Sequence, residues 1–128
     1  MENKIKELGI TKSGFQPNIA AMLAYVLPLA TGTAMFLIEK GNKYVRFHAL
    51  QAILFGAVWI ILWILAGIGT TKLWPIPIVG WMINDVVYFA IVLGGFAVWL
   101  FLLYKAYSGE RFKLPVLGKM AERIAQRP

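Results

Sequence analysis

The chain has 128 residues, of which 59% are hydrophobic and 15% charged, with a net charge of +7 and no cysteine. A soluble domain is usually about 45–50% apolar and about 25% charged, so this composition excludes an ordinary soluble globule, a disordered chain and a disulfide-stabilised secreted domain. The charges gather at 1–12, 39–46 and 105–128 and leave three long segments nearly free of charge. We therefore expect a single integral membrane domain over 1–128.

Three hydrophobic segments are long enough to cross a bilayer as helices. They cover residues 19–38, 47–69 and 84–106, after an N-terminal tail over 1–18. A helix needs roughly 20 apolar residues to cross a hydrocarbon core about 30 Å thick, and these segments do not alternate as membrane β-strands do. The sequence thus predicts an all-α, polytopic membrane protein with three transmembrane helices.

The first segment contains a proline near its middle. Pro28 has no backbone N–H and leaves the carbonyl of Ala24 without its helical partner. The hydroxyl groups of Thr31 and Thr33 are close enough in sequence to satisfy backbone groups of this kind. We expect a kinked transmembrane helix here rather than a substrate site.

Polar side chains enter the membrane together at the start of the second segment. Arg46 precedes it, and His48 and Gln51 share one helix face because they are three residues apart. With Glu39 at the end of the first segment, they form a candidate site for a lipid headgroup or a partner protein. The alternative is an interfacial collar of snorkelling side chains that binds no ligand.

The segment 71–85 contains two prolines and two tryptophans. Proline interrupts a continuous helix, and tryptophan is typical of the headgroup level of a membrane. We expect an irregular loop in the outer interface, with a short re-entrant hairpin that lines a cavity as the alternative. Asp85 is expected to cap the third helix.

The C-terminal tail over 110–128 has the spacing of a basic amphipathic helix, after a helix stop at Gly109. Its apolar face consists of Leu117, Met120, Ala121 and Ile124, and its basic face of Lys119, Arg123 and Arg127. Such a helix is expected to lie on an anionic leaflet surface. Packing against the end of the bundle is the alternative.

Lys and Arg set the expected orientation of the chain. With three crossings, nine of them lie on the face that carries residues 39–46 and the C-terminal tail, and four lie on the opposite face. We therefore predict a multi-pass protein of the cell (inner or plasma) membrane, with its N-terminus outside and its C-terminus in the cytoplasm.

Side chains suited to catalysis are scarce. His48 is the only histidine, cysteine is absent, and no ligand spacing for a metal or haem occurs. Motifs for nucleophilic catalysis or phosphate binding are also missing. We expect no cofactor, no metal and no enzymatic activity, and the basic charge at membrane boundaries favours lipid over nucleic acid as a partner.

Several short motifs carry a family resemblance. They are Leu27-Pro28-Leu29, Leu37-Ile38-Glu39-Lys40, Val45-Arg46-Phe47-His48-Ala49, Ala106-Tyr107-Ser108-Gly109-Glu110 and Lys113-Leu114-Pro115. Over about residues 17–124 the chain resembles a bacterial and archaeal family of small membrane proteins, a domain of unknown function related to the Tic inner-envelope subunit of chloroplast protein import. The resemblance implies that Arg46, His48, Glu110 and Pro115 matter, and it supplies no catalytic residue. Its chloroplast relatives are described as four-helix, channel-like import components, whereas this chain offers three spans.

Two classes of function follow. The first is an accessory or interaction subunit of a membrane complex, linked through the resemblance to protein translocation or insertion. Its expected partners are a bilayer with anionic headgroups and other membrane proteins or further copies of itself. The candidate lipid- or partner-binding residues are Glu39, Arg46, His48, Gln51, Glu110, Lys119 and Arg123. The alternative is a homo-oligomeric channel or transporter for ions or small solutes.

Overall fold

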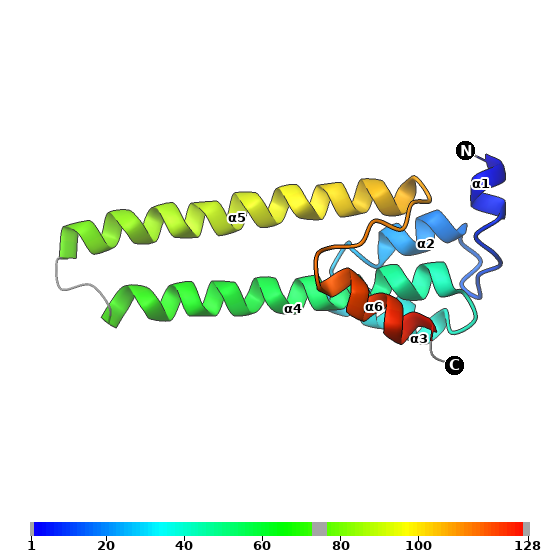
Figure 1. Cartoon of the computed structure of the whole chain (residues 1–128), viewed down its shortest axis with the longest axis horizontal. Helices are drawn as coiled ribbons and strands as arrows, with labels where there is room; N and C mark the ends of the chain where they lie inside the picture. Colours follow the sequence, from blue (N-terminus) through cyan, green and yellow to red (C-terminus); the bar gives the residue numbers. More distant parts are fainter. Residues whose placement is uncertain (1, 73–76, 127–128) are drawn as a thin grey trace.

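The computed structural model describes residues 2–72 and 77–126, and for 69–72 and 77 it describes the backbone alone. Over those ranges it contains helices and no strand. The helices are α1 (Glu2–Lys6), α2 (Pro17–Leu23), α3 (Ala30–Ile38), α4 (Lys43–Lys72), α5 (Pro77–Tyr107) and α6 (Leu117–Gln126). The two long helices, α4 and α5, lie side by side, and the short helices gather around one end of this pair (Figure 1). The predicted all-α class is confirmed.

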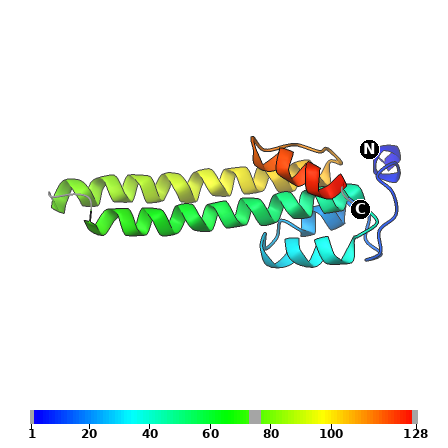
Figure 2. The same ribbon diagram turned by 60° about the horizontal axis from the view of Figure 1, so that its bottom comes forward.

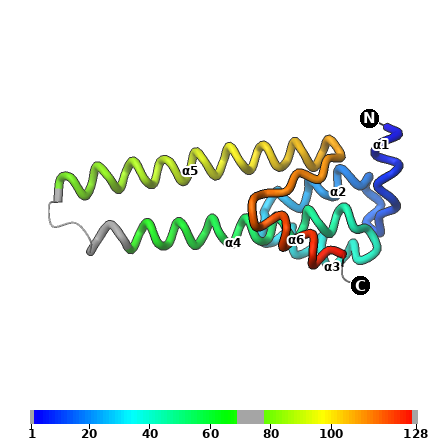
Figure 3. The backbone as a smooth tube through the Cα atoms, viewed as in Figure 1, coloured from blue at the N-terminus to red at the C-terminus, as the bar shows by residue number. Residues whose placement is uncertain are grey.

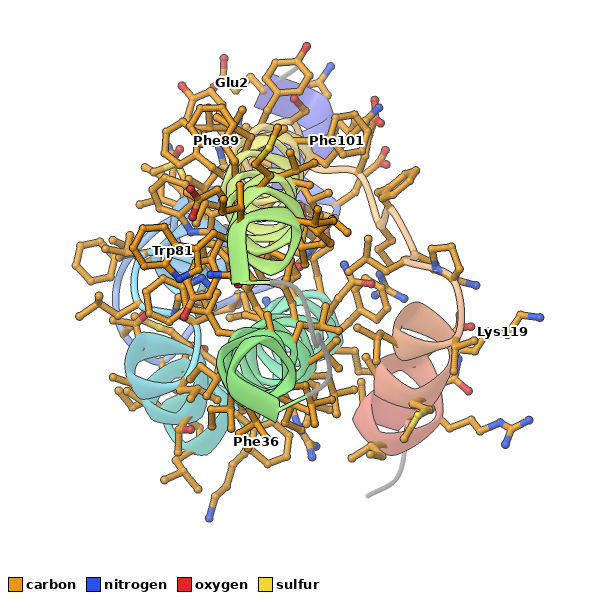
Figure 4. The ribbon with its side chains drawn as sticks, turned by 90° about the vertical axis from the view of Figure 1, so that its left-hand side faces the viewer. Glu2, Phe36, Trp81, Phe89, Phe101 and Lys119 are labelled. Carbon is orange, nitrogen blue, oxygen red and sulfur yellow. The ribbon has the colours of Figure 1, made fainter. Side chains whose placement is uncertain are left out.

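Within the described residues, two helices are long and apolar enough to cross a membrane, over Lys43–Ile68 of α4 and Ile78–Tyr107 of α5. They meet where large side chains of α4 rest on α5. The Trp59 indole donates to the Ile91 carbonyl at 3.2 Å, and the rings of Trp63 and Tyr88 lie 5.5 Å apart. Away from this contact, apolar side chains of α5 such as Phe89 and Phe101 point outward, as expected of a helix surrounded by lipid (Figure 4).

The predicted transmembrane helix over 19–38 is wrong. The chain forms two short helices there, α2 and α3, and reverses direction between them. The start of α2 and the end of α3 therefore lie at the same end of the α4–α5 pair (Figure 3). Pro28 cannot donate a helical hydrogen bond, and the Thr31 hydroxyl takes over locally. It accepts from the Leu27 N–H at 3.0 Å and lies 3.1 Å from the Ala24 carbonyl. A break of the helix, rather than the expected kink, is the result.

The turn between α2 and α3 is held by further hydrogen bonds. Thr33 donates to the Leu29 carbonyl at 2.6 Å, so the predicted local role of both threonines is confirmed. From α5, the Trp99 indole donates to the Tyr25 carbonyl. The Trp99 bond satisfies a carbonyl that the end of α2 would leave open, and it fixes the turn against α5.

The region 71–85 also differs from the prediction. α4 continues to Lys72 and α5 begins at Pro77, so residues 77–85 are helical rather than part of a loop or a re-entrant hairpin. Pro77 stands at the first helical position, where a missing N–H costs little and the fixed φ favours a helix. Asp85 therefore lies inside α5 and does not cap it. Residues 73–76 lie outside the described part of the chain.

The C-terminal part contains the predicted helix stop and a following helix, which packs as the alternative prediction described. Gly109 has a φ of 80°, and two bonds, from the Glu110 N–H to the Lys105 carbonyl and from the Gly109 N–H to the Ala106 carbonyl, close a Schellman motif after α5. The chain then turns back, and α6 packs against the first half of α4, which was the alternative to a free surface helix.

Both chain ends lie at the same end of the α4–α5 pair (Figure 2). Asn18, in α2, donates to the Tyr107 carbonyl at 3.0 Å, and the Tyr44 hydroxyl of α4 donates to the Ala106 carbonyl at 2.6 Å. We term this end, which carries residues 2–42 and 105–126, the basic end. The prediction that the two tails lie on opposite faces depended on three crossings and does not fit this arrangement.

Candidate functional site

Three polar side chains form a closed cluster inside the basic end. His48 and Gln51 point the same way from α4, as their spacing predicts, and meet Tyr25 from the turn between α2 and α3. The Tyr25 hydroxyl lies 3.1 Å from Nδ1 of His48 and accepts from Nε2 of Gln51 at 3.0 Å. All three residues are fully buried. We term them the Tyr–His–Gln cluster.

The Tyr–His–Gln cluster binds the segment that joins α5 to α6. Nε2 of His48 lies 3.0 Å from the Glu110 carbonyl. Gln51 uses both ends of its amide: Nε2 donates to the Phe112 carbonyl at 2.9 Å, and Oε1 accepts from the Leu114 N–H at 2.9 Å. The Glu110 carbonyl can only accept, so Nε2 of His48 carries a proton. In a neutral imidazole Nδ1 then accepts from the Tyr25 hydroxyl.

Aromatic rings close around His48. The ring centroids of Tyr44, Phe47 and Tyr25 lie 4.7, 5.0 and 5.8 Å from that of the imidazole, all in edge-to-face arrangements. Each polar atom of the cluster has a partner within the chain. A buried network whose hydrogen bonds are all satisfied favours one packing over others. The arrangement therefore supports a role for His48 and Gln51 in holding the α5–α6 segment against α4 rather than in binding a ligand.

Glu39 fastens the N-terminal segment. Its carboxylate is buried and accepts from the backbone N–H groups of Lys12 at 2.9 Å and Ser13 at 2.8 Å. Burial raises the pKa of this carboxyl, but the hydrogen bonds from Ser13 and Lys12 outweigh burial, so the pKa lies below its ordinary value of 4.5. The ionised Glu39 carboxylate therefore holds residues 12–13 against the end of α3.

Arg46 and Glu110 also make internal contacts. The Arg46 guanidinium lies 4.8 Å from the centre of the Phe36 ring and donates to the Lys40 carbonyl at 3.4 Å. The exposed Glu110 carboxylate pairs with Lys105 at 2.6 Å. The hydrogen bond and the charge of Lys105 hold the pKa of Glu110 below its usual range.

Lys119 and Arg123 lie on the exposed side of α6, and Lys119 points away from the bundle (Figure 4). Met120 and Ile124, which the sequence placed on one apolar face with Leu117 and Ala121, are exposed beside them. The buried face instead consists of Gly118, Ala121 and Ala125. Ala121 and Ala125 pack on α4, whereas Gly118 lies against Lys113 of the connecting segment. This packing leaves a mixed basic and apolar outer face of the kind found on membrane-surface helices.

The predicted site residues thus share one end of the molecule but not one open site. Glu39, His48 and Gln51 are buried and hydrogen-bonded to backbone groups of other segments. Lys119 and Arg123 of α6 are exposed on the surface, away from these three side chains. Sequence reasoning missed Tyr25, Tyr44 and Asn42. Of these, Asn42 carried a readable signal because it directly precedes α4: its Oδ1 accepts from the Val45 N–H at 3.1 Å, as an N-cap does.

Comparison with known proteins places these observations in a family context. A family model described as the magnetosome magnetite crystal formation protein family matches residues 16–121. A UPF0132 membrane protein of Methanocaldococcus jannaschii is 40% identical over 120 residues, which cover 93% of this chain and 97% of the relative. A UPF0132 membrane protein of Archaeoglobus fulgidus is 40% identical over 107 residues, which cover 83% of this chain and 92% of the relative. No solved structure matches the chain.

These similarities confirm the predicted small archaeal membrane-protein family and its membrane location. The match over residues 16–121 spans nearly the same range as the motifs that suggested the family. The relation to the chloroplast import subunit stays a prediction.

Proposed function

We propose a function on the premise that this chain belongs to the magnetosome magnetite crystal formation protein family, alongside the archaeal UPF0132 membrane proteins. It acts as a non-enzymatic accessory or interaction subunit of a membrane complex. The family description names a mineral, but the described residues contain no group of three or more His, Cys, Asp or Glu side chains that could hold a metal ion.

One observation carries the proposal: an apolar groove runs along the outer surface where α4 and α5 meet. The groove has a volume of about 300 Å³ and includes Phe55 and Leu62 of α4 and Ala90 and Gly94 of α5. A Cβ atom on Gly94 would meet nothing within 4 Å, so this part of α5 is open to a neighbour. Small residues on a membrane helix permit close approach of a second helix, and we propose a transmembrane helix of a partner protein as the occupant.

A substitution at Gly94 tests this proposal. A Cβ at position 94 meets nothing within 4 Å, so we expect Gly94→Leu to fill the groove, leave the fold intact and lose the partner. The assay is cross-linking in native membranes followed by affinity purification in mild detergent, with identification of co-purifying membrane proteins. The control is Phe89→Leu, which changes an exposed apolar residue that does not line this groove and is expected to keep the partner. Purification of the unmodified protein without a stoichiometric partner would contradict the proposal.

The link to protein translocation or insertion rests on the sequence resemblance. Recovery of a component of the insertion or translocation machinery in the same purification supports it, and recovery only of unrelated membrane proteins counts against it.

The alternative is a homo-oligomeric channel or transporter, and one groove favours it. This groove, of about 600 Å³, lies far from the basic end and includes Asn84, Asp85 and Tyr88 of α5. Polar side chains at membrane depth are typical of pathways for ions or solutes. Reconstituted protein that conducts, and that stops conducting on Asp85→Ala, would support the alternative. Absence of conductance and solute flux at every tested potential would exclude it.

A further inference from the structure

We infer that the α2–α3 hairpin inserts into one leaflet of the membrane and does not cross it. The hairpin enters from the basic end, turns inside the bilayer and returns to the same face. The chain then crosses the membrane only twice, through α4 and α5, and both of its tails lie on one side. This inference concerns the lipid partner of the hairpin and does not depend on the proposed partner protein.

The depth of the hairpin follows from the residues that its turn touches. A Cβ on Gly56 of α4 would lie 3.0 Å from Cβ of Pro28, so the turn is level with Gly56. Gly56 comes 13 residues after Lys43, the first residue of α4. At about 1.5 Å per residue, the turn lies about 20 Å along α4, whereas a full crossing requires about 30 Å of hydrocarbon. The turn is therefore deep enough to leave the headgroups but too shallow to reach the other face.

The outer surface of the hairpin is apolar. Its exposed large side chains are Val26, Leu27, Leu29, Leu37 and Ile38, and Leu27 at the turn is 61% exposed. This surface continues onto the exposed apolar sides of α4 and α5. Backbone groups at the turn are satisfied by Thr31 and Trp99, which is the condition for irregular backbone at membrane depth. Acyl chains of one leaflet are the occupant that fits such a surface.

Both ends of the hairpin are tied at the basic end. The Glu39 carboxylate, just after α3, accepts from the N–H groups of Lys12 and Ser13, just before α2. Asn18, near the start of α2, donates to the carbonyl of Tyr107 at the end of α5. Because these contacts join residues before and after the hairpin, its two ends cannot lie on opposite faces of a bilayer.

Charge identifies the leaflet. Among residues whose position is described, eleven Lys and Arg belong to the basic end or the first turn of α4, and Lys72 ends α4 at the opposite end. The eleven are Lys4, Lys6, Lys12, Lys40, Lys43, Arg46, Lys105, Arg111, Lys113, Lys119 and Arg123. Lys and Arg near membrane helices favour the cytoplasmic side, where anionic headgroups attract them. The basic end, with both tails, is therefore cytoplasmic, and the earlier expectation of an outside N-terminus is replaced.

Single-cysteine labelling tests the topology, since the chain has no cysteine of its own. The variants are Asn3→Cys, Lys72→Cys and Gln126→Cys, treated with a membrane-impermeant maleimide in right-side-out and inverted vesicles. We expect positions 3 and 126 to react only in inverted vesicles and position 72 only in right-side-out vesicles. Positions 3 and 72 reacting together, with 126 on the other side, would restore three crossings and overturn the inference.

Spin labels test whether the hairpin enters the lipid. Labels are placed at Leu27→Cys in the turn and at Leu37→Cys near the end of α3, both exposed in the structure. We expect the label at 27 to collide with dissolved oxygen more, and with a water-soluble nickel chelate less, than the label at 37. Equal accessibility of both labels to the chelate would show a hairpin lying outside the bilayer and would refute the inference even if both tails are cytoplasmic.

Discussion

Replacing Gln51 by leucine should weaken the docking of α6 on α4. Gln51 makes three hydrogen bonds: to the Tyr25 hydroxyl, to the Phe112 carbonyl and from the Leu114 N–H. Leucine has a similar volume but no polar group, so Gln51→Leu removes all three bonds without leaving a large cavity. The connecting segment then keeps the contact between its Glu110 carbonyl and Nε2 of His48, and α6 keeps its packing on α4, but the docking is weaker.

The expected magnitude follows from the two backbone groups that lose their partner. A buried donor or acceptor left without a hydrogen bond costs about 1–3 kcal/mol, so the two groups together weaken docking of the segment by at least about 2 kcal/mol. Since 1.4 kcal/mol corresponds to a factor of about ten, the open state of α6 becomes roughly 30-fold more populated. Tyr25 keeps its bond to His48, so the hairpin stays in place.

Amide hydrogen exchange measured by mass spectrometry on the protein in lipid nanodiscs checks this prediction. Peptides from residues 117–126 should exchange roughly 30-fold faster in Gln51→Leu, while those from the middle of α5 keep their rate. The control is Gln16→Leu, because Gln16 is exposed and its side chain makes no capping bond. Unchanged exchange of α6 in Gln51→Leu would refute the role assigned to the Tyr–His–Gln cluster.

Two further predictions concern helix packing and pH. Gly95→Ala places a Cβ 2.4 Å from the Trp59 indole and should lower the free energy of unfolding by about 1–3 kcal/mol, whereas the Cβ of Gly94→Ala meets open space and should leave it unchanged. Thermal unfolding in detergent compares the two variants, and equal midpoints would contradict the packing of α4 on α5. Because the folded-state pKa of Glu39 lies below 4.5, its contribution to stability is complete above that pH and is lost as the pH falls through the lowered pKa. The amide resonances of Lys12 and Ser13 should then shift in acid, and the same titration in Glu39→Gln should show no such shift.

The two long helices could be predicted from the sequence because a charge-free apolar run of membrane length has few other solutions. Their ends could not be placed as well: α5 begins at Pro77 rather than at residue 84. Proline reads as a helix breaker, but at the first helical position it favours a start. The place of Pro77 at the first position of α5, rather than the proline content of the segment, determines where the helix begins.

The α2–α3 hairpin could not be predicted for a different reason. Residues 19–38 are a charge-free, largely apolar run long enough for one membrane helix, and Pro28 alone would only bend it. Contacts distant in sequence convert the bend into a reversal, above all the bond from Trp99 to the Tyr25 carbonyl and the tie from Glu39 to residues 12–13.

The binding role predicted for the candidate site stays a prediction, but the internal partners of its side chains could not be foreseen from the sequence. His48 and Gln51 do share a face, as their spacing predicts. Polar side chains at a membrane boundary suggest a ligand because single-sequence reasoning does not reveal internal partners. Here those partners are backbone groups of residues 110, 112 and 114, more than 60 positions away.

The distance between residues 18 and 107 tests the account most directly. In the structure the Asn18 side chain donates to the Tyr107 carbonyl at 3.0 Å, whereas a first helix that crossed the membrane would separate these positions by about 30 Å of hydrocarbon. With Asn18→Cys and Tyr107→Cys in one chain, a short thiol cross-linker applied in native membranes should join the two positions, and Asn18→Cys with Lys72→Cys should not react. Cross-linking of 18 to 72, and none of 18 to 107, would contradict the account.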